Sequence, residues 1–361
     1  MTATLTAFAD LERADLDRWD QLALDSPEPN PFHGPGFVTA AARLGPREPH
    51  LLIVHEGERW DACLPVSRTT AGRPPLPAVR TWHTPYLFLG TPLLRAGAGE
   101  QAMGELLALG RAQRTCVFAL DQVDPRGTAG VALVSAAAAA HLPLELKSSH
   151  ERALLNRRPE PADYVTGKRA HHRRELARLG RRLAQDLGEI RVVDRRGEPG
   201  ATADFMALEL AGWKGQAGTA MASTAAGSRF FEEICRRFAE RQCLQMLALY
   251  AGDSLVAMKC NLIAGEGIFC FKIAHDERLS RYSPGVQLEL ANIEIFHQGT
   301  AAWMDSCAQP GNKMINSLWP DRRAIATLAT PARGLIRGAP ARAMAAGQRI
   351  NRRRRSHDAV R

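Results

Sequence analysis

The stretch that decides the fold reads IFCFKIAHDERLSRYSPG over residues 268–285 and is followed, after a helical run, by AAWMDS at 301–306. An apolar strand ends in a polar loop, and the loop enters a helix through Ser283, Pro284 and Gly285. Serine is a favoured N-cap and proline a favoured first helical residue, while glycine lets a ligand approach the backbone. Free N–H groups and the helix dipole attract phosphate, so the pattern predicts a β-α-β unit with an anion site in its first loop. The alternative is a well-capped structural helix.

The composition is typical of a globular protein with two domains. The chain has 361 residues, of which 45% are hydrophobic and 24% charged, and domains usually hold about 100–200 residues. It contains no apolar stretch of about 18 residues, and its start lacks a basic region and a long apolar core, so we expect neither a membrane span nor a signal peptide. The seven cysteines are scattered without a CxxC pair, which favours a cytoplasmic protein without a metal site.

The net charge of +9 is compatible with anionic partners of many kinds. Much of the excess lies in Lys168–Arg182 and Arg349–Arg355, although a GC-rich genome alone could produce the arginines. The second segment has no interleaved aromatic residues, so we expect no DNA binding. We interpret residues 336–361 as a basic, disordered tail that allows peripheral membrane contact.

Strand and helix patterns alternate along the chain, which predicts an α/β (α+β) fold. A polar stretch at 148–161 predicts a seam between domains at 1–150 and 151–335. The first domain is predicted to hold helical pieces within 11–45, strands at 50–56, 60–66 and 115–120, a loop at 74–77, and helices at 99–109 and 131–140. The second is predicted to hold strands at 189–194, 244–251, 255–263, 267–274, 301–306 and 323–330, and helices at 166–187, 204–213, 227–241 and 286–298.

Several motifs resemble those of the CelD-type acyltransferases linked to cellulose biosynthesis, which are related to Fem-type transferases within the GNAT superfamily. The matching stretches are Gly167-Lys168-Arg169, Gly212-Trp213-Lys214-Gly215, Lys272-Ile273-Ala274-His275-Asp276-Glu277, Tyr282-Ser283-Pro284-Gly285, Trp303-Met304-Asp305 and Asn316-Ser317-Leu318-Trp319-Pro320. The resemblance is strongest over about residues 165–330. It implies tandem GNAT-like domains, each a mixed central sheet flanked by helices, with the second sheet splayed between strands 267–274 and 301–306.

The resemblance also implies that acyl-CoA, as co-substrate, binds at the start of the helix joining those two strands. The cofactor-binding residues would be Arg278, Arg281, Ser283, Gly285 and Val286. The loop departs from the usual acetyltransferase pattern, Gln/Arg-x-x-Gly-x-Gly/Ala, because Gly285 stands four residues after Arg281 and no second glycine follows.

Four residues are candidates for the chemistry: His275, Asp276, Tyr282 and Asp305. Attack by a neutral amine needs a proton acceptor near pH 7, and His275, Asp276 or Glu277 at the strand end would supply it. Asp305 would orient the amine or hold a nearby cation. Tyr282, or water, would take the place of the tyrosine acid that is missing from residues 308–330. For the strand-end residues and Asp305, an ordinary polar turn is the alternative.

Trp213, Lys214 and Lys272 are candidates for substrate binding, and Lys272 would stabilise an oxyanion if it faced the cleft. A core tryptophan and lysines at the surface or a sheet edge are the alternatives. We expect acyl transfer from acyl-CoA to an amine, on an amino sugar or nucleotide-sugar of envelope polysaccharide synthesis. An aminoacyl-tRNA-dependent Fem-type transferase is one alternative, favoured by the basic helix. A non-catalytic GNAT-like scaffold is the other, favoured by the missing glycine and tyrosine.

Overall fold

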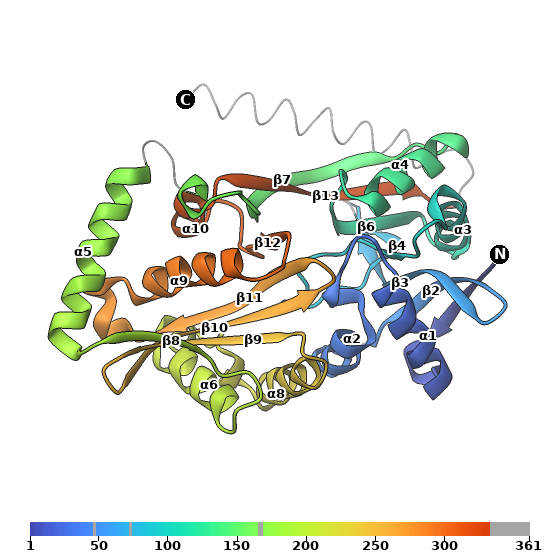
Figure 1. Ribbon diagram of the computed structural model, residues 1–361. Coiled ribbons are helices and arrows are strands. Elements are labelled where there is room, and N and C mark those ends of the chain that lie inside the picture. Colours follow the sequence, from blue (N-terminus) through green and yellow to red (C-terminus); the bar gives the residue numbers. More distant parts are fainter. Residues whose placement is uncertain (46–47, 72–73, 165–168, 333–361) are drawn as a thin grey trace. The chain divides into compact units, whose positions relative to one another are not determined.

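The computed structural model describes residues 1–45, 48–71, 74–164 and 169–332, and the chain divides into two compact units (Figure 1). Among the described residues, unit 1 takes 1–34, 48–149 and 325–332, and unit 2 takes 35–45 and 150–324. The two units are therefore interleaved in sequence. The tail predicted at 336–361 lies outside the described residues, as does the start of the predicted helix at 166–187.

Unit 1 is a mixed sheet whose core lies against two helices. Across the sheet the strands are β1 (Thr2–Ala7), β2 (His50–Glu56), β3 (Arg59–Ala71), β4 (Leu76–Thr81), β6 (Val117–Val123) and the end of β13 (Asp321–Pro331), with β5 (Leu93–Leu94) beside β3. The helices are α1 (Arg13–Leu24), α3 (Gly99–Ala112) and α4 (Thr128–Ala139). Alternate strand side chains, including Val66, Val79 and Leu120, pack with those of α3 and α4 in one buried cluster, as the period of two in a strand requires.

Unit 2 is a second mixed sheet with helices on both faces. Its strands are β7 (Glu145–Asn156, from His150 on), β12 (Trp303–Asp305), β11 (Gly267–His275), β10 (Ser254–Ala264), β9 (Leu244–Ala251) and β8 (Ile190–Asp194). Its helices are α2 (Pro35–Ala41), α5 (Arg169–Leu187), α6 (Ala201–Ala211), α7 (Trp213–Gln216), α8 (Ala225–Glu240), α9 (Pro284–Gln298) and α10 (Lys313–Leu318). Figure 1 shows α9 on one face of the sheet and α6 and α8 on the other.

The two sheets repeat one arrangement, which confirms the predicted fold class. In each, three antiparallel pairings lead to one parallel pair, and a final antiparallel strand completes the sheet. The parallel pairs are β4 with β6 and β11 with β12. The final strands are exchanged in sequence: β7, from the first half of the chain, pairs with β12, and β13, from the end, pairs with β6.

Three strands differ from the sequence expectations. β1 was not predicted, β4 begins inside the loop predicted at 74–77, and β7 runs through the polar stretch at 148–161. Prolines interrupt the strand pattern at the start of β4. The first residues of β7 are mostly exposed and lack a hydrophobic alternation, so the sequence pattern does not indicate a strand there. Tertiary pairing, not local preference, makes these segments strands.

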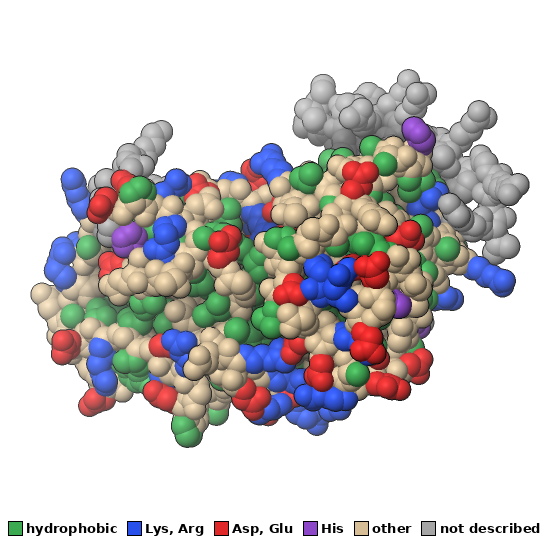
Figure 2. All heavy atoms as spheres, turned by 45° about the vertical axis from the view of Figure 1, so that its right-hand side comes forward, with side chains coloured by type: hydrophobic (Ala, Val, Ile, Leu, Met, Phe, Trp, Pro, Cys, Tyr) green, Lys and Arg blue, Asp and Glu red, His purple; other side chains and the backbone are tan. Residues whose placement is uncertain are grey.

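The surface shows no large area of one charge on the face drawn in Figure 2. Basic and acidic side chains are interspersed there, with hydrophobic side chains between them. The net charge of +9 therefore does not produce a single basic patch on that face.

Candidate functional site

The candidate site begins where the parallel pair of unit 2 separates. β11 and β12 are partners only over Gly267–Phe269 and Trp303–Asp305, and beyond Phe269 β11 continues to His275 with β10 as its ladder partner. The register with β10 also shifts near Lys272, which leaves Phe271 without a partner in that ladder. Ligands of open α/β sheets bind beyond the carboxyl ends of the strands, and bulges occur beside active sites. The end of β11 is therefore placed to line a site.

The helix that follows starts at Pro284, two residues before the predicted bound, and Ser283 does not cap it with its side chain. Ser283 has a left-handed backbone, with φ of 54°, and its hydroxyl makes no capping hydrogen bond. Its carbonyl oxygen instead accepts from the N–H groups of Val286 and Gln287, at 2.9 and 3.0 Å. A left-handed non-glycine residue costs of order 1–3 kcal/mol and is often found at functional turns.

His275, the last residue of β11, lies against this helix start. A Cβ atom added at Gly285 would stand only 3.3 Å from the Nδ1 atom of His275. Burial lowers the pKa of His275, and Lys214 acts in the same direction, while Glu277 and Asp276 oppose the shift. The imidazole is therefore neutral near pH 7, which is the form that can accept a proton.

A shallow pocket opens beside His275. Its lining comes from α6, α7 and the end of β11: Leu208, Glu209, Gly212, Trp213, Lys214, Ile273, Ala274, His275 and Glu277. The Trp213 side chain is 58% exposed, and the backbone N–H of Trp213 donates to the Glu277 carboxylate at 2.6 Å. The structure thus brings together Trp213, Lys214 and His275, three residues selected from the sequence, and places an accessible aromatic ring at the rim.

Glu209, which lines the pocket, binds Lys214 of the lining and also Lys272 of β11, which lies outside the lining. Its buried carboxylate accepts from the Nζ atoms of Lys214 at 2.9 Å and Lys272 at 3.2 Å, and from the Met221 N–H at 2.7 Å. Burial raises the pKa of Glu209, but the two lysines and the Met221 amide outweigh it, and the net pKa is lowered. Burial lowers the pKa of Lys272 in spite of this partner. Sequence reasoning missed Glu209, whose only signal was an acid in an otherwise apolar helix.

Lys214 makes a second contact that matters for the separated strand. Its Nζ atom donates to the carbonyl oxygen of Ile273 at 2.9 Å. Ile273 belongs to the part of β11 that follows its pairing with β12. The lysine therefore ties α7 to the free end of the strand and holds the pocket in shape.

The two arginines expected to bind the donor have partners within the chain. Arg278 binds the Asp276 carboxylate through two nitrogens, at 2.7 to 3.1 Å, and stays exposed. Arg281 donates to the Tyr282 hydroxyl at 2.6 Å and lies over its ring. That hydroxyl in turn donates to Asp186 of α5. Asp276 and Tyr282 are thus each held by an arginine.

Asp305 is enclosed, not open to solvent. Its side chain is fully buried, and its carboxylate accepts from Arg152 at 2.6 Å and Arg323 at 3.1 Å. Burial raises the pKa of Asp305, but the two arginines and the Cys307 N–H lower it overall. The sequence pointed to neither arginine, because they come from β7 and β13. A buried Lys259–Glu289 ion pair links β10 to α9 in the same unit.

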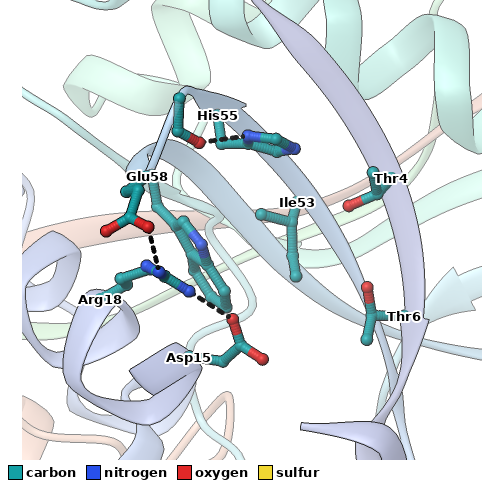
Figure 3. Close-up of a pocket in the computed structure, with 9 residues that line it drawn as sticks. Thr4, Thr6, Asp15, Arg18, Ile53, His55 and Glu58 are labelled. Atoms are coloured by element: carbon teal, nitrogen blue, oxygen red, sulfur yellow. Dashed lines mark hydrogen bonds and ion pairs between the residues drawn. The ribbon is translucent and has the colours of Figure 1, made fainter. Parts of the chain in front are cut away.

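Unit 1 has hollows of its own. The one in Figure 3 lies between α1 and the first strands and is lined by Thr4, Thr6, His55 and Arg18 among others. Arg18 is paired with Asp15 and Glu58, each at 3.1 Å, and the Nδ1 atom of His55 lies 2.8 Å from the Gly57 carbonyl oxygen. Ion pairs near the surface contribute little to stability. The groups of this hollow do not repeat the arrangement found around His275.

Within the described ranges, no group of three or more His, Cys, Asp or Glu side chains is arranged to hold a metal ion. In that same part of the chain, no helix combines the length and the apolar character needed to cross a membrane.

Several solved structures have the same fold at low sequence identity. FemX is 9% identical with a TM-score of 0.59, over 91% of this chain and 97% of its own. The C-terminal domain of a putative lysylphosphatidylglycerol synthetase from Agrobacterium fabrum is 13% identical with a TM-score of 0.55, over 88% and 91%. L-PGS from Bacillus licheniformis is 11% identical with a TM-score of 0.50, over 94% and 98%. At these identities the likeness concerns the fold alone.

Sequence comparison gives a narrower result. No curated protein matches the chain. A model of the acetyltransferase (GNAT) domain matches residues 170–310, which contain the separated strands, the start of α9 and the pocket beside His275. The similarity to this family therefore lies within unit 2.

Proposed function

We propose that unit 2 transfers an acyl group from acyl-CoA to an amine, with His275 as the general base. The observation that carries the proposal is the neutral His275 at the end of the separated strand, in contact with the start of α9 and at the edge of a pocket. A neutral base within reach of the acceptor is what amine attack on a thioester requires near pH 7.

In the proposed step the amine nitrogen attacks the thioester carbonyl carbon, and the proton of that nitrogen passes to the His275 imidazole. The tetrahedral intermediate collapses, the C–S bond breaks, and the coenzyme leaves as a thiolate that takes a proton from water or from Tyr282. Glu277, which lines the pocket, would attract the amine, while Asp276 stays paired with Arg278. Lys214 and Lys272, fixed by Glu209, would favour the developing oxyanion. Asp305, buried and held by two arginines, takes no part in this proposed step.

The donor would lie along the free end of β11, with its phosphates at the start of α9. Ser283, Gly285 and Val286 would face the phosphates, and Arg278 and Arg281 would stand at the rim. Gly285 suits this role because it has no Cβ atom and lies against His275. The acceptor would be an amino sugar or nucleotide-sugar of envelope polysaccharide synthesis, used in the cytoplasm.

One observation favours a second donor, an aminoacyl-tRNA. Both donor-site arginines already have partners in the chain, and the glycine spacing departs from the usual CoA loop. Phosphates of CoA would have to compete with Asp276 for Arg278. The fold is also that of FemX, although fold alone does not identify a donor.

A binding experiment separates the two donors. Melting temperature is measured with acetyl-CoA, with longer acyl-CoAs and with charged tRNA, because a ligand that binds only the native state raises it. We expect stabilisation by an acyl-CoA and its loss in Gly285→Asp, which places a carboxylate beside His275. Gly104→Asp is the control, since a Cβ at Gly104 of α3 meets nothing within 4 Å. Stabilisation by tRNA alone would replace the donor, and binding of neither would remove the proposal.

A further inference from the structure

Unit 1 has a hollow on a face of its sheet, beside the end of its own parallel strand pair. β4 and β6 are parallel partners only over Ala78–Arg80 and Val117–Ala119. The hollow lies just beyond, with a volume of about 400 Å³, and is lined by Ser67, Thr69, Arg80, Thr81, His83, Asp121, Gln122 and Thr327. The carboxyl ends of a parallel pair are where open α/β sheets bind ligands, and the volume is in the range of small-molecule sites.

The polar lining lies on one face of the sheet. Val66, Val79, Leu120 and Leu328 belong to the core shared with α3 and α4. Each has as its neighbour in the chain one of Ser67, Arg80, Asp121 and Thr327, which therefore point to the opposite face. Four consecutive strands, β3, β4, β6 and β13, thus each contribute a polar side chain to the same hollow.

The charges in the hollow cancel. The Arg80 guanidinium binds the Asp121 carboxylate through two nitrogens, with Nε to Oδ2 at 2.9 Å and Nη2 to Oδ1 at 2.5 Å. The Thr327 hydroxyl donates to the same carboxylate at 3.2 Å. A compensated arginine does not attract a phosphate strongly, and a carboxylate with three donors does not attract an amine. The pair instead presents fixed, directional hydrogen-bonding groups.

The backbone at the edge of the hollow is strained. Gln122 of β6 has φ of 56°, a left-handed conformation that a strand residue without glycine's freedom rarely adopts. Such strain is retained where surrounding structure holds it in place, and it is concentrated at ligand sites. The left-handed backbone of Gln122 changes the direction of the strand where Asp121 and Gln122 line the hollow.

We propose that this face of unit 1 binds a neutral, polyhydroxylated ligand, namely a sugar unit of a glycan. The hydroxyls of Ser67, Thr69 and Thr327, with the oriented Arg80–Asp121 pair, supply both donors and acceptors and no net charge. A sugar presents the complementary set of donors and acceptors. The inference goes beyond acyl transfer, because the hollow is formed by unit 1 residues alone and needs no donor.

The experiment measures glycan binding to the full chain in the absence of any acyl donor. A glycan array selects neutral oligosaccharides, and isothermal titration measures the affinity of the strongest one. Thr69→Tyr fills the hollow, and Thr70→Tyr is the matched control. The two threonines are adjacent exposed residues of β3 whose side chains point to opposite faces, and tyrosine is well tolerated in strands, so both variants should fold.

We expect Thr69→Tyr to weaken binding by about tenfold or more, a factor that corresponds to about 1.4 kcal/mol, and Thr70→Tyr to leave it unchanged. Equal loss in both variants, or no neutral glycan bound on the array, overturns the proposal. Binding of inorganic phosphate with no neutral glycan would also overturn it, because the charges would then not cancel. None of these outcomes bears on acyl transfer, which is tested with acyl-CoA at unit 2.

Discussion

The two units have the same strand pairing but treat the end of their parallel pair differently. In unit 2 the residues after the pair form a pocket around His275. In unit 1 the gap between the same two strands is filled by the chain itself. Gly90 lies so close to both strand ends that a Cβ there would stand 2.0 Å from the Asp121 carbonyl oxygen and 3.1 Å from Thr81. Its N–H donates to the Gln122 carbonyl oxygen at 2.9 Å.

The length of one connection explains the difference. In unit 2, residues 276–283 lead from β11 directly into α9, so the helix start faces the open end of the strands. In unit 1, residues 82–98 separate β4 from α3, and part of this loop is fixed in the gap. Asn30 donates to the carbonyl oxygens of Leu89 and Thr91, and Thr91 is fully buried. One topology can therefore leave the end of its parallel pair open or close it with a loop.

The largest expected effect on stability follows from the exchange of the final strands. A chain that stops after Ala324 loses the end of β13 and with it Ala326 and Leu328, which belong to the unit 1 core. β6 would become an unpaired edge, and we expect unit 1 to lose cooperative unfolding, measured by hydrogen exchange. A chain that stops after Ala332 keeps the strand and should retain protection in β6. Protection of β6 in the shorter chain would show that unit 1 does not need this strand.

His275→Ala tests whether the end of the parallel strand pair in unit 2 is where acyl transfer takes place. Loss of a positioned general base costs about 100-fold or more in turnover, and we expect that loss in steady-state rates with the acyl-CoA that binds. His55→Ala, in the hollow of Figure 3, is the control and should leave the rate unchanged. Equal rates in both variants would remove His275 from the mechanism while leaving the fold comparison intact.

Two glycines, each close to the strand ends of its own unit, sharpen the contrast. Gly90→Ala drives a methyl group into the Asp121 backbone, and we expect a loss of about 3 kcal/mol or more in the free energy of unfolding. Gly285→Ala meets His275 at 3.3 Å, a contact that a small side-chain shift relieves, so we expect less than about 1 kcal/mol. Denaturant unfolding of both variants measures the difference. A mild Gly90→Ala would mean that the gap in unit 1 can open.

The local elements of unit 2 could be predicted from the sequence. β9 has the predicted bounds, and α9 starts within two residues of its prediction, because alternating or helical hydrophobic patterns and Pro284 mark these elements. The shared neighbourhood of Trp213, Lys214 and His275 was not predicted, since the first two residues lie far from the third in the chain. Their catalytic and binding roles stay predictions.

Contacts between distant segments could not be predicted. Asp305 looked like a strand-end acid facing a cleft, and its two arginine partners come from strands at the two ends of unit 2's sequence. No local pattern announces which strand completes a sheet, so the exchange of β7 and β13 was invisible. Glu209 was missed for the same reason, because a buried acid in a helix has meaning only once both lysines are placed beside it.

The loss of stability at acidic pH should be larger from the buried histidine of unit 1, His33, than from His275 of unit 2. His33 of unit 1 is fully buried, with its Nδ1 atom 2.9 Å from the Thr91 carbonyl oxygen. Burial lowers the pKa of His33 from 6.5 to about 3, although the hydrogen bond to Thr91 opposes the shift. The unfolded chain then binds a proton that the folded chain excludes, so stability falls as pH drops below 6.5. From pH 7 to pH 5 the loss from this group is about 2 kcal/mol.

His33→Asn isolates this contribution, because asparagine keeps a donor for Thr91 but does not titrate. We expect the variant to lose about 2 kcal/mol less than the parent chain between pH 7 and pH 5 in urea unfolding. His275, half-buried and with a pKa lowered less, acts in the same direction with a smaller effect, so His275→Asn should change the pH dependence less. An equal pH dependence of stability in the parent chain and in His33→Asn would show that water reaches His33. In that case the loop at Thr91 would open, and the gap in unit 1 could admit a ligand.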